Sequence, residues 1–179
     1  MLFRSIRAFG VSTLVVDPVM VAKSGDALLA DDARKAIHDD LLPLATVITP
    51  NLYEAEALLG REIRSLETMR EAARALRGIG CRWVVLKGGS LDIDGRAVDV
   101  VCDGSETTLL ASPRLDTTNT QGTGCTFASA IAAGLARGMA PPEAIRRAKE
   151  YVSEAIRNGP RIGSGHGPVN HLTGVQSRW

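Results

Sequence analysis

Short apolar runs alternate along the chain with longer segments whose apolar residues recur at helical spacing. The short runs, rich in Val and Ile, predict strands, and the amphipathic segments predict helices. We predict strands over residues 13–17, 46–49 and 83–87, and helices over residues 31–42, 51–59, 65–79, 122–137 and 141–158. Two alternating runs, 96–102 and 106–111, are separated by Asp103 and Gly104, which is typical of a β-hairpin. Strands alternating with helices favour a mostly parallel central sheet covered on both faces, a three-layer α/β/α fold.

Several residues are typical of helix ends. Asp31 or Asp32 is expected to cap the helix that begins there, and Ser65 is expected to cap a later one. Gly60 and Gly80 are expected just past the ends of two helices.

The whole chain, residues 1–179, is expected to form a single domain whose last part, residues 160–179, is a loop-rich tail. Residues 1–10 predict a helix that leads into the first strand. A helix with no strand before it indicates either that part of the fold is missing upstream or that a short N-terminal helix packs on the sheet. The pattern leaves both interpretations open.

Composition narrows the classes of function. The chain is 45% hydrophobic and 23% charged, as in an ordinary globular protein. The net charge is +1 with both signs mixed, which does not suggest a nucleic-acid partner, and no apolar run reaches the roughly 18 residues of a membrane span. The three cysteines, Cys81, Cys102 and Cys125, are odd in number and lack metal-site spacing, so a reducing, cytoplasmic setting is expected.

A glycine-rich segment, Gln121-Gly122-Thr123-Gly124-Cys125-Thr126, directly precedes an apolar helix. Its glycines let backbone N–H groups approach an anion, and the helix N-terminus adds positive potential, so the segment suits a transferring phosphoryl group. Cys125 in the first turn favours the thiolate and could take a proton from a substrate hydroxyl or position it. The alternative is a tight packing turn with Cys125 as a small buried filler. The spacing fits neither a P-loop nor a dinucleotide fingerprint.

Polar residues follow three of the predicted strands, where ligands bind in sheets of this kind. Asp17 is suited to hold a metal or a phosphate-bound water, and the alternative is a turn initiator before Pro18. Asn51 and Glu54 form N-x-x-E at a helix start, which suits Mg²⁺ or, alternatively, a capping box. Lys87 could contact nucleotide phosphates or be a solvated lysine before a loop.

Five segments, in this order, resemble the bacterial hydroxymethylpyrimidine and phosphomethylpyrimidine kinases of the ribokinase-like superfamily. They are VVDPVMVAKSGDALL, ITPNLYEAEALLG, VVLKGG, TNTQGTGCTFASAIAAGLARG and GHGPVNHL. One segment alone is weakly diagnostic, but five in order are specific. Cys125 favours the pyrimidine branch, because related sugar and pyridoxal kinases usually carry Asp at the corresponding place.

The resemblance implies ATP-dependent, Mg²⁺-dependent phosphorylation of 4-amino-5-hydroxymethyl-2-methylpyrimidine and then of its monophosphate, in thiamine biosynthesis. It implies an anion hole at Gly122, Thr123, Gly124 and Cys125, with Cys125 as the catalytic residue. It implies nucleotide-side contacts at Lys87, Thr120, Gly122 and Gly124. It further implies metal and phosphate-water carboxylates at Asp17 and Glu54, and a substrate-pocket wall at Val19. Members of the family often form homodimers, so a second copy is an expected partner beside the small-molecule substrate.

The chain departs from the family pattern in two ways. Gln121 stands where many members carry His, so a titratable group is lost while a donor and an acceptor remain. The family's N-terminal third, with its glycine-rich opening motif and much of the pyrimidine pocket, has no counterpart in these residues. We therefore expect poor phosphorylation by this chain alone, and an exposed sheet edge that self-association could cover. The alternatives are a pyridoxine or pyridoxal kinase and a catalytically incompetent nucleotide-binding module.

Overall fold

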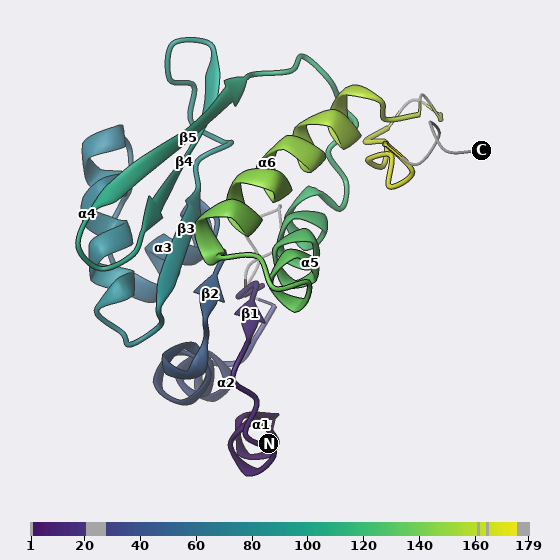
Figure 1. Ribbon diagram of the computed structural model, residues 1–179. Helices are drawn as coiled ribbons and strands as arrows, with labels where there is room; N and C mark the ends of the chain where they lie inside the picture. Colours follow the sequence, from purple (N-terminus) through teal and green to yellow (C-terminus); the bar gives the residue numbers. More distant parts are fainter. Residues whose placement is uncertain (1, 21–27, 161, 164, 175–179) are drawn as a thin grey trace. The chain divides into compact units, whose positions relative to one another are not determined.

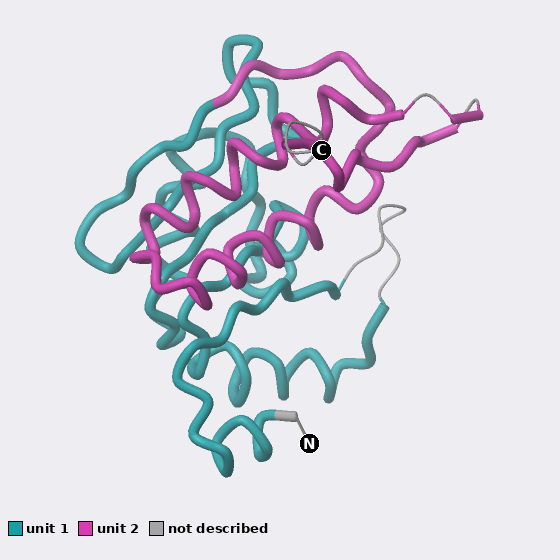
Figure 2. The backbone as a smooth tube through the Cα atoms, turned by 45° about the vertical axis from the view of Figure 1, so that its right-hand side comes forward, with its two compact units in different colours: residues 1–111 teal, residues 112–179 magenta. Residues whose placement is uncertain are grey.

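A computed structural model of the chain describes residues 2–20, 28–160, 162–163 and 165–174 (Figure 1). Residues 21–27 of the first family-like segment, and parts of the predicted tail, lie outside the described residues. The chain divides into two compact units, Met1–Ala111 and Ser112–Trp179 (Figure 2).

The sheet has five strands in the order β1-β2-β3-β4-β5. Their bounds are β1 Val15–Val16, β2 Val47–Ile48, β3 Trp83–Lys87, β4 Arg96–Cys102 and β5 Thr107–Pro113. β1, β2 and β3 are parallel, an arrangement that requires crossover connections such as the helical segments between them, whereas β4 runs antiparallel to β3. The sheet is therefore mixed, with its parallel part at β1 to β3. Asp103 directly follows β4 and accepts hydrogen bonds from the backbone N–H groups of Ser105 and Glu106, in the predicted hairpin turn.

The first unit has one helix before β1, and its other helical segments connect β1, β2 and β3. They are α1 Leu2–Ala8, α2 Asp31–Ala36, the π-helical η1 Ile37–Leu41, the 3₁₀ turn η2 Leu42–Leu44, α3 Leu52–Leu59 and α4 Leu66–Arg77. α3 and α4 contact each other and both contact β3. Apolar side chains of these elements form one buried core, which includes Leu42, Ile48, Met69, Leu76, Val84 and Leu86. Burying aliphatic side chains on this scale is the main force that holds the helices to the sheet.

Two of the predicted helix starts are confirmed. Asn51 caps α3, and Ser65 caps α4 through reciprocal hydrogen bonds with Thr68. Gly60 ends α3 with φ of 65°, a left-handed conformation that glycine adopts without steric cost. α4 ends at Arg77, two residues before the predicted end.

The prediction that Asp31 or Asp32 caps the following helix is wrong. The N-cap is Ala30, without a side-chain hydrogen bond, and both aspartates lie in the first turn of α2. Asp31 bonds to Arg34 there, and Asp32 Oδ1 accepts a hydrogen bond of 2.8 Å from the N–H of Ala33. Carboxylates in a first turn interact favourably with the helix dipole without acting as caps.

The second unit contains α5 Thr123–Ala136 and α6 Pro141–Arg157, which pack against each other. The contact is close at Gly134, where an added Cβ would lie 3.0 Å from Cβ of Ala144. α6 begins with two prolines, which suit the first turn of a helix, and its first turns carry a surface ion network. Arg146 donates to both carboxylate oxygens of Glu143, which lowers the pKa of Glu143 to about 2.

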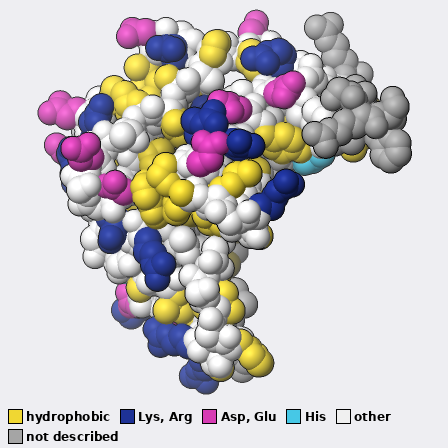
Figure 3. All heavy atoms as spheres, viewed as in Figure 1, with side chains coloured by type: hydrophobic (Ala, Val, Ile, Leu, Met, Phe, Trp, Pro, Cys, Tyr) yellow, Lys and Arg dark blue, Asp and Glu magenta, His cyan; other side chains and the backbone are white. Residues whose placement is uncertain are grey.

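Acidic and basic side chains are mixed on the surface drawn in Figure 3. None of the helices in the described part of the chain is long and apolar enough to cross a membrane.

Candidate functional site

The parallel strands bring three polar residues of the first unit together. Asp17 follows β1, Thr49 follows β2 and Lys87 ends β3, so all three lie at the carboxyl edge of the parallel strands. Lys87 Nζ donates to Asp17 Oδ1 over 2.8 Å, and Thr49 Oγ1 donates to the same oxygen over 3.0 Å. The side chains of Lys87 and Asp17 are only 17% and 14% exposed. This is a partly buried ion pair rather than a solvated lysine before a loop.

Glu54 adds a second carboxylate to this cluster. Its Oε2 accepts a 2.7 Å hydrogen bond from the N–H of Asn51, and Asn51 Oδ1 accepts one of 2.9 Å from the N–H of Glu54. The capping-box interpretation is thus confirmed. Burial, at 3% exposure, is the main cause that raises the pKa of Glu54, and the Asp17 charge raises it further, while the Asn51 bond and Lys87 lower it. The metal role of Glu54 stays a prediction.

The backbone after β3 is held by a carboxylate that the sequence analysis missed. The N–H of Gly88 donates over 3.0 Å to Oδ1 of Asp99, a residue of β4 that is 5% exposed. A Cβ on Gly88 would lie 2.2 Å from the carbonyl oxygen of Val98 and 2.5 Å from Met69, so only glycine fits. The available signal was an acidic residue within an otherwise apolar strand, since a buried carboxylate needs a partner.

Asp17 and Glu54 offer oxygen ligands, the type that Mg²⁺ prefers. Within the described ranges, no three His, Cys, Asp or Glu side chains are grouped so that they could hold a metal ion. Mg²⁺ in phosphoryl-transfer enzymes commonly uses one or two carboxylates, with water and phosphate completing its shell. Two neighbouring carboxylates fit that pattern and do not form a complete protein cage.

In the second unit, the glycine-rich segment forms a turn that starts α5. Gly122 is the N-cap with φ of 85°. Thr123 Oγ1 donates to the carbonyl of Thr120 over 2.7 Å, and Thr126 Oγ1 donates to the carbonyl of Gly122 over 2.7 Å. The first N–H groups of a helix have no partner within the helix. This geometry suits an anion, and the role of the turn as an anion hole stays a prediction.

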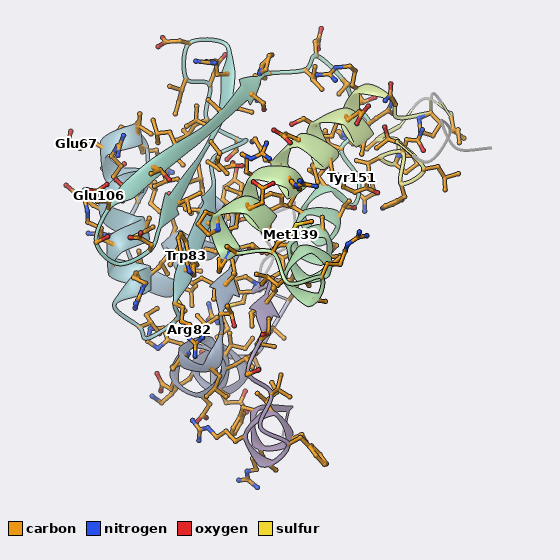
Figure 4. The ribbon with its side chains drawn as sticks, viewed as in Figure 1. Glu67, Arg82, Trp83, Glu106, Met139 and Tyr151 are labelled. Atoms are coloured by element: carbon orange, nitrogen blue, oxygen red, sulfur yellow. The ribbon has the colours of Figure 1, made fainter. Side chains whose placement is uncertain are left out.

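Cys125 is the third residue of α5 and is exposed, so it is not a buried filler. It borders an open groove of about 690 Å³ between α5 and α6. Met139 and Tyr151, labelled in Figure 4, also line this groove, together with Thr126 and His171. A ligand bound at the turn thus has an adjoining surface on which to lie.

The remaining predicted residues lie beside these two groups. Val19 is 46% exposed, and its N–H bonds the carbonyl of Asp17 over 2.9 Å. Gln121 is anchored by its backbone, because its N–H donates to Gly167 and its carbonyl accepts from Val169. The sequence analysis also missed His171, whose Nε2 lies 3.0 Å from Thr126 Oγ1. Its segment was part of the family resemblance, but nothing in the local pattern linked it to a residue 45 positions away.

Comparison with known proteins points to one family of kinases. The model of the phosphomethylpyrimidine kinase family matches residues 1–170. A hydroxymethylpyrimidine/phosphomethylpyrimidine kinase of Streptomyces coelicolor is 52% identical over 157 residues, which cover 88% of this chain and 58% of that protein.

Solved structures of related kinases share the fold. The Bacillus subtilis pyridoxal kinase, in an ADP complex, superposes with a TM-score of 0.89 at 39% identity and covers 96% of this chain. The Clostridium difficile phosphomethylpyrimidine kinase superposes with a TM-score of 0.73 at 34% identity and covers 87% of this chain. This chain spans 64% and 62% of those two proteins. The predicted α/β class is confirmed.

Proposed function

Because the chain belongs to the phosphomethylpyrimidine kinase family, we propose that it transfers a phosphoryl group from ATP to a hydroxymethylpyrimidine and to its monophosphate, in thiamine biosynthesis. Its ribokinase-like fold is shared by kinases that act on two different rings, as the names of its relatives state. The chain spans less than two thirds of these relatives. Activity, substrate and partners of the whole protein are therefore part of the proposal.

The glycine turn at the start of α5 is the observation that carries this proposal. Backbone N–H groups from Gly122 to Cys125 would hold the transferred phosphoryl group, where fixed donors stabilise developing negative charge. The exposed Cys125, as its thiolate, would take the proton of the substrate hydroxyl while the hydroxyl oxygen forms its bond to phosphorus, leaving Cys125 as the neutral thiol. The bond from that phosphorus to ADP breaks in the same transfer. Thr120, which accepts from Thr123, would support the nucleotide side of the turn.

The carboxylate cluster would serve the phosphates. Lys87 would exchange its bond to Asp17 for one to a nucleotide phosphate, since an ammonium group pairs well with either. Asp17 and Glu54 would then hold Mg²⁺ and its waters. Mg²⁺, when bound, supplies positive charge that neutralises the phosphates. Val19, next to Asp17 and partly exposed, would contact the pyrimidine.

The pyridoxal alternative has a specific basis, because a pyridoxal kinase is among the most similar folds. Cys125 favours the pyrimidine, since it stands where related sugar and pyridoxal kinases usually carry Asp.

We further propose a cytoplasmic protein that forms homodimers, as the family often does.

The test is phosphoryl transfer by the purified 179-residue chain. ADP release would be measured with ATP and Mg²⁺ and either hydroxymethylpyrimidine or pyridoxal, beside a Cys125→Ala variant. We expect pyrimidine-dependent release that the variant loses by about a hundredfold or more, the usual scale for a proton-transfer group. Faster turnover of pyridoxal would favour the alternative. A folded chain that does not bind ATP would contradict the proposal, and ATP binding without any transfer would indicate the incompetent module.

A further inference from the structure

We propose that His171 is a positioning residue that holds the phosphate-binding turn in shape through a hydrogen bond to Thr126. That the turn binds phosphate rests on the proposed function, whereas the role of His171 in shaping the turn does not. All the residues involved belong to the unit Ser112–Trp179.

The direction of the hydrogen bonds can be worked out from geometry. Thr126 Oγ1 lies 2.7 Å from the carbonyl oxygen of Gly122, and a carbonyl cannot donate, so the hydroxyl proton lies on that bond. The hydroxyl has no second proton for His171. The 3.0 Å contact must therefore be a donation from Nε2–H of His171 to Thr126 Oγ1.

This arrangement fixes the start of α5. The carbonyl of Gly122 accepts from both the hydroxyl and the N–H of Thr126, the latter over 2.9 Å. Gly122 itself is in the left-handed conformation that turns the chain into the helix. Thr126 is only 7% exposed, so its second lone pair depends on a protein partner. His171 supplies that partner.

His171 is exposed, but its backbone is fixed to α6. Its carbonyl accepts the hydroxyl of Tyr151 over 2.9 Å, and the neighbouring N–H of Asn170 donates to Ala155 over 2.9 Å. Figure 4 labels Tyr151 on α6. A continuous set of bonds thus runs from α6 through residues 170–171 to Thr126 and the turn. Losing the histidine donor would loosen the turn without removing any group that contacts the phosphate.

The first measurement is hydrogen exchange at the N–H of Thr126, which needs no ligand. We expect faster exchange there in His171→Leu than in the wild-type chain, by about fivefold, the value of one ordinary hydrogen bond. His171→Gln, which places an N–H donor at similar reach, should restore the protection. Unchanged exchange at Thr126, or equally increased exchange along all of α5 and α6, would overturn the proposal. His38→Leu controls for loss of a histidine elsewhere.

The second measurement is ATP–Mg²⁺ affinity of the same folded variants. His171→Leu should bind about fivefold more weakly and His171→Gln nearly as well as wild type. Thr126→Val should bind at least as weakly as His171→Leu, because it also loses the hydrogen bond to the carbonyl of Gly122. Because His171 acts through Thr126, the double variant should be no weaker than Thr126→Val alone. Additive losses would refute this coupling. A wild-type chain that fails to bind ATP would contradict the proposed function and leave the exchange test decisive for His171.

Discussion

Glu54 is a carboxylate that folding places in a poorly solvated position beside a second carboxylate. Burial raises its pKa above the usual 4.5, so the folded state favours its protonated form. Its contribution to stability is complete below the pKa of the unfolded chain and is lost as pH rises through the raised value. The ionised residue at neutral pH therefore costs stability.

Glu54→Gln is expected to raise the free energy of unfolding at about pH 8, with the gain shrinking toward about pH 4. The glutamine amide oxygen can still accept the bond from Asn51, so the cap remains while the buried charge is removed. Urea unfolding of both proteins across this pH range measures the difference. A difference in the free energy of unfolding that does not change with pH would contradict the raised pKa of Glu54. If Glu54 also serves Mg²⁺, the same variant should lose the Mg²⁺ dependence of ATP binding.

Gly88 and Gly89 provide a matched pair. Gly88→Ala should destabilise the fold by about 1–3 kcal/mol, because its Cβ would collide with the carbonyl of Val98. Gly89→Ala should change stability by less than about 0.5 kcal/mol, since a Cβ there meets no atom within 4 Å. Chemical denaturation of both variants makes the comparison. Equal losses of stability in the two variants would show that the backbone near Lys87 can shift to accommodate a Cβ at Gly88.

Some residues of the candidate site could be identified from the sequence, and others could not. The meeting of Asp17, Glu54 and Lys87 followed from one rule, that parallel strands end at a common edge. Asp99 and His171 could not be found in this way. Their bonds to Gly88 and Thr126 depend on strand register and on the path of a loop, which local periodicity does not encode.

At the scale of elements, the bounds of strands and helices were predicted well where the spacing of apolar residues was regular along the whole element. β3 and β4 have the predicted bounds, and α6 ends one residue earlier than expected. Residues 31–42 were predicted to form one α-helix, but the α-helix ends at Ala36. The chain then continues as a π-helical segment and a 3₁₀ turn. Pro43 explains part of this, since proline removes a backbone donor and disfavours an α conformation before it. The π segment adds a residue per turn, a change that apolar spacing does not reveal.

The cap of α4 should be measurable by itself. Ser65→Ala is expected to lower the free energy of unfolding by about 1 kcal/mol, because the N–H of Thr68 loses its acceptor. Ser65→Asp should retain most of the stability, since aspartate is an equally good N-cap. Urea titration gives both values. A Ser65→Asp variant as unstable as Ser65→Ala would mean that the hydroxyl acts through something other than capping.

At the scale of the molecule, 157 of the 179 residues match the Streptomyces relative and cover 58% of it. Among the described strands, β1 lies at one edge of the sheet. The glycine turn at the start of α5 and the carboxylate cluster are both formed within the 179 residues. The rest of that relative has no match in this chain, and we propose that it supplies much of the contact with the pyrimidine. The 179-residue chain should therefore keep nucleotide binding but orient the pyrimidine acceptor poorly.

We accordingly expect the 179-residue chain to bind ATP–Mg²⁺ but to phosphorylate hydroxymethylpyrimidine at least about a hundredfold more slowly than the Streptomyces relative, because a poorly oriented acceptor costs a factor of this size. Both proteins would be assayed side by side at saturating ATP, with Cys125→Ala as the blank. A slow rate that rises with pyrimidine concentration without saturating would place the defect in acceptor binding. Equal rates would show that these residues alone orient the acceptor, and that the pyrimidine pocket is formed from the 179 residues themselves or from two copies of them.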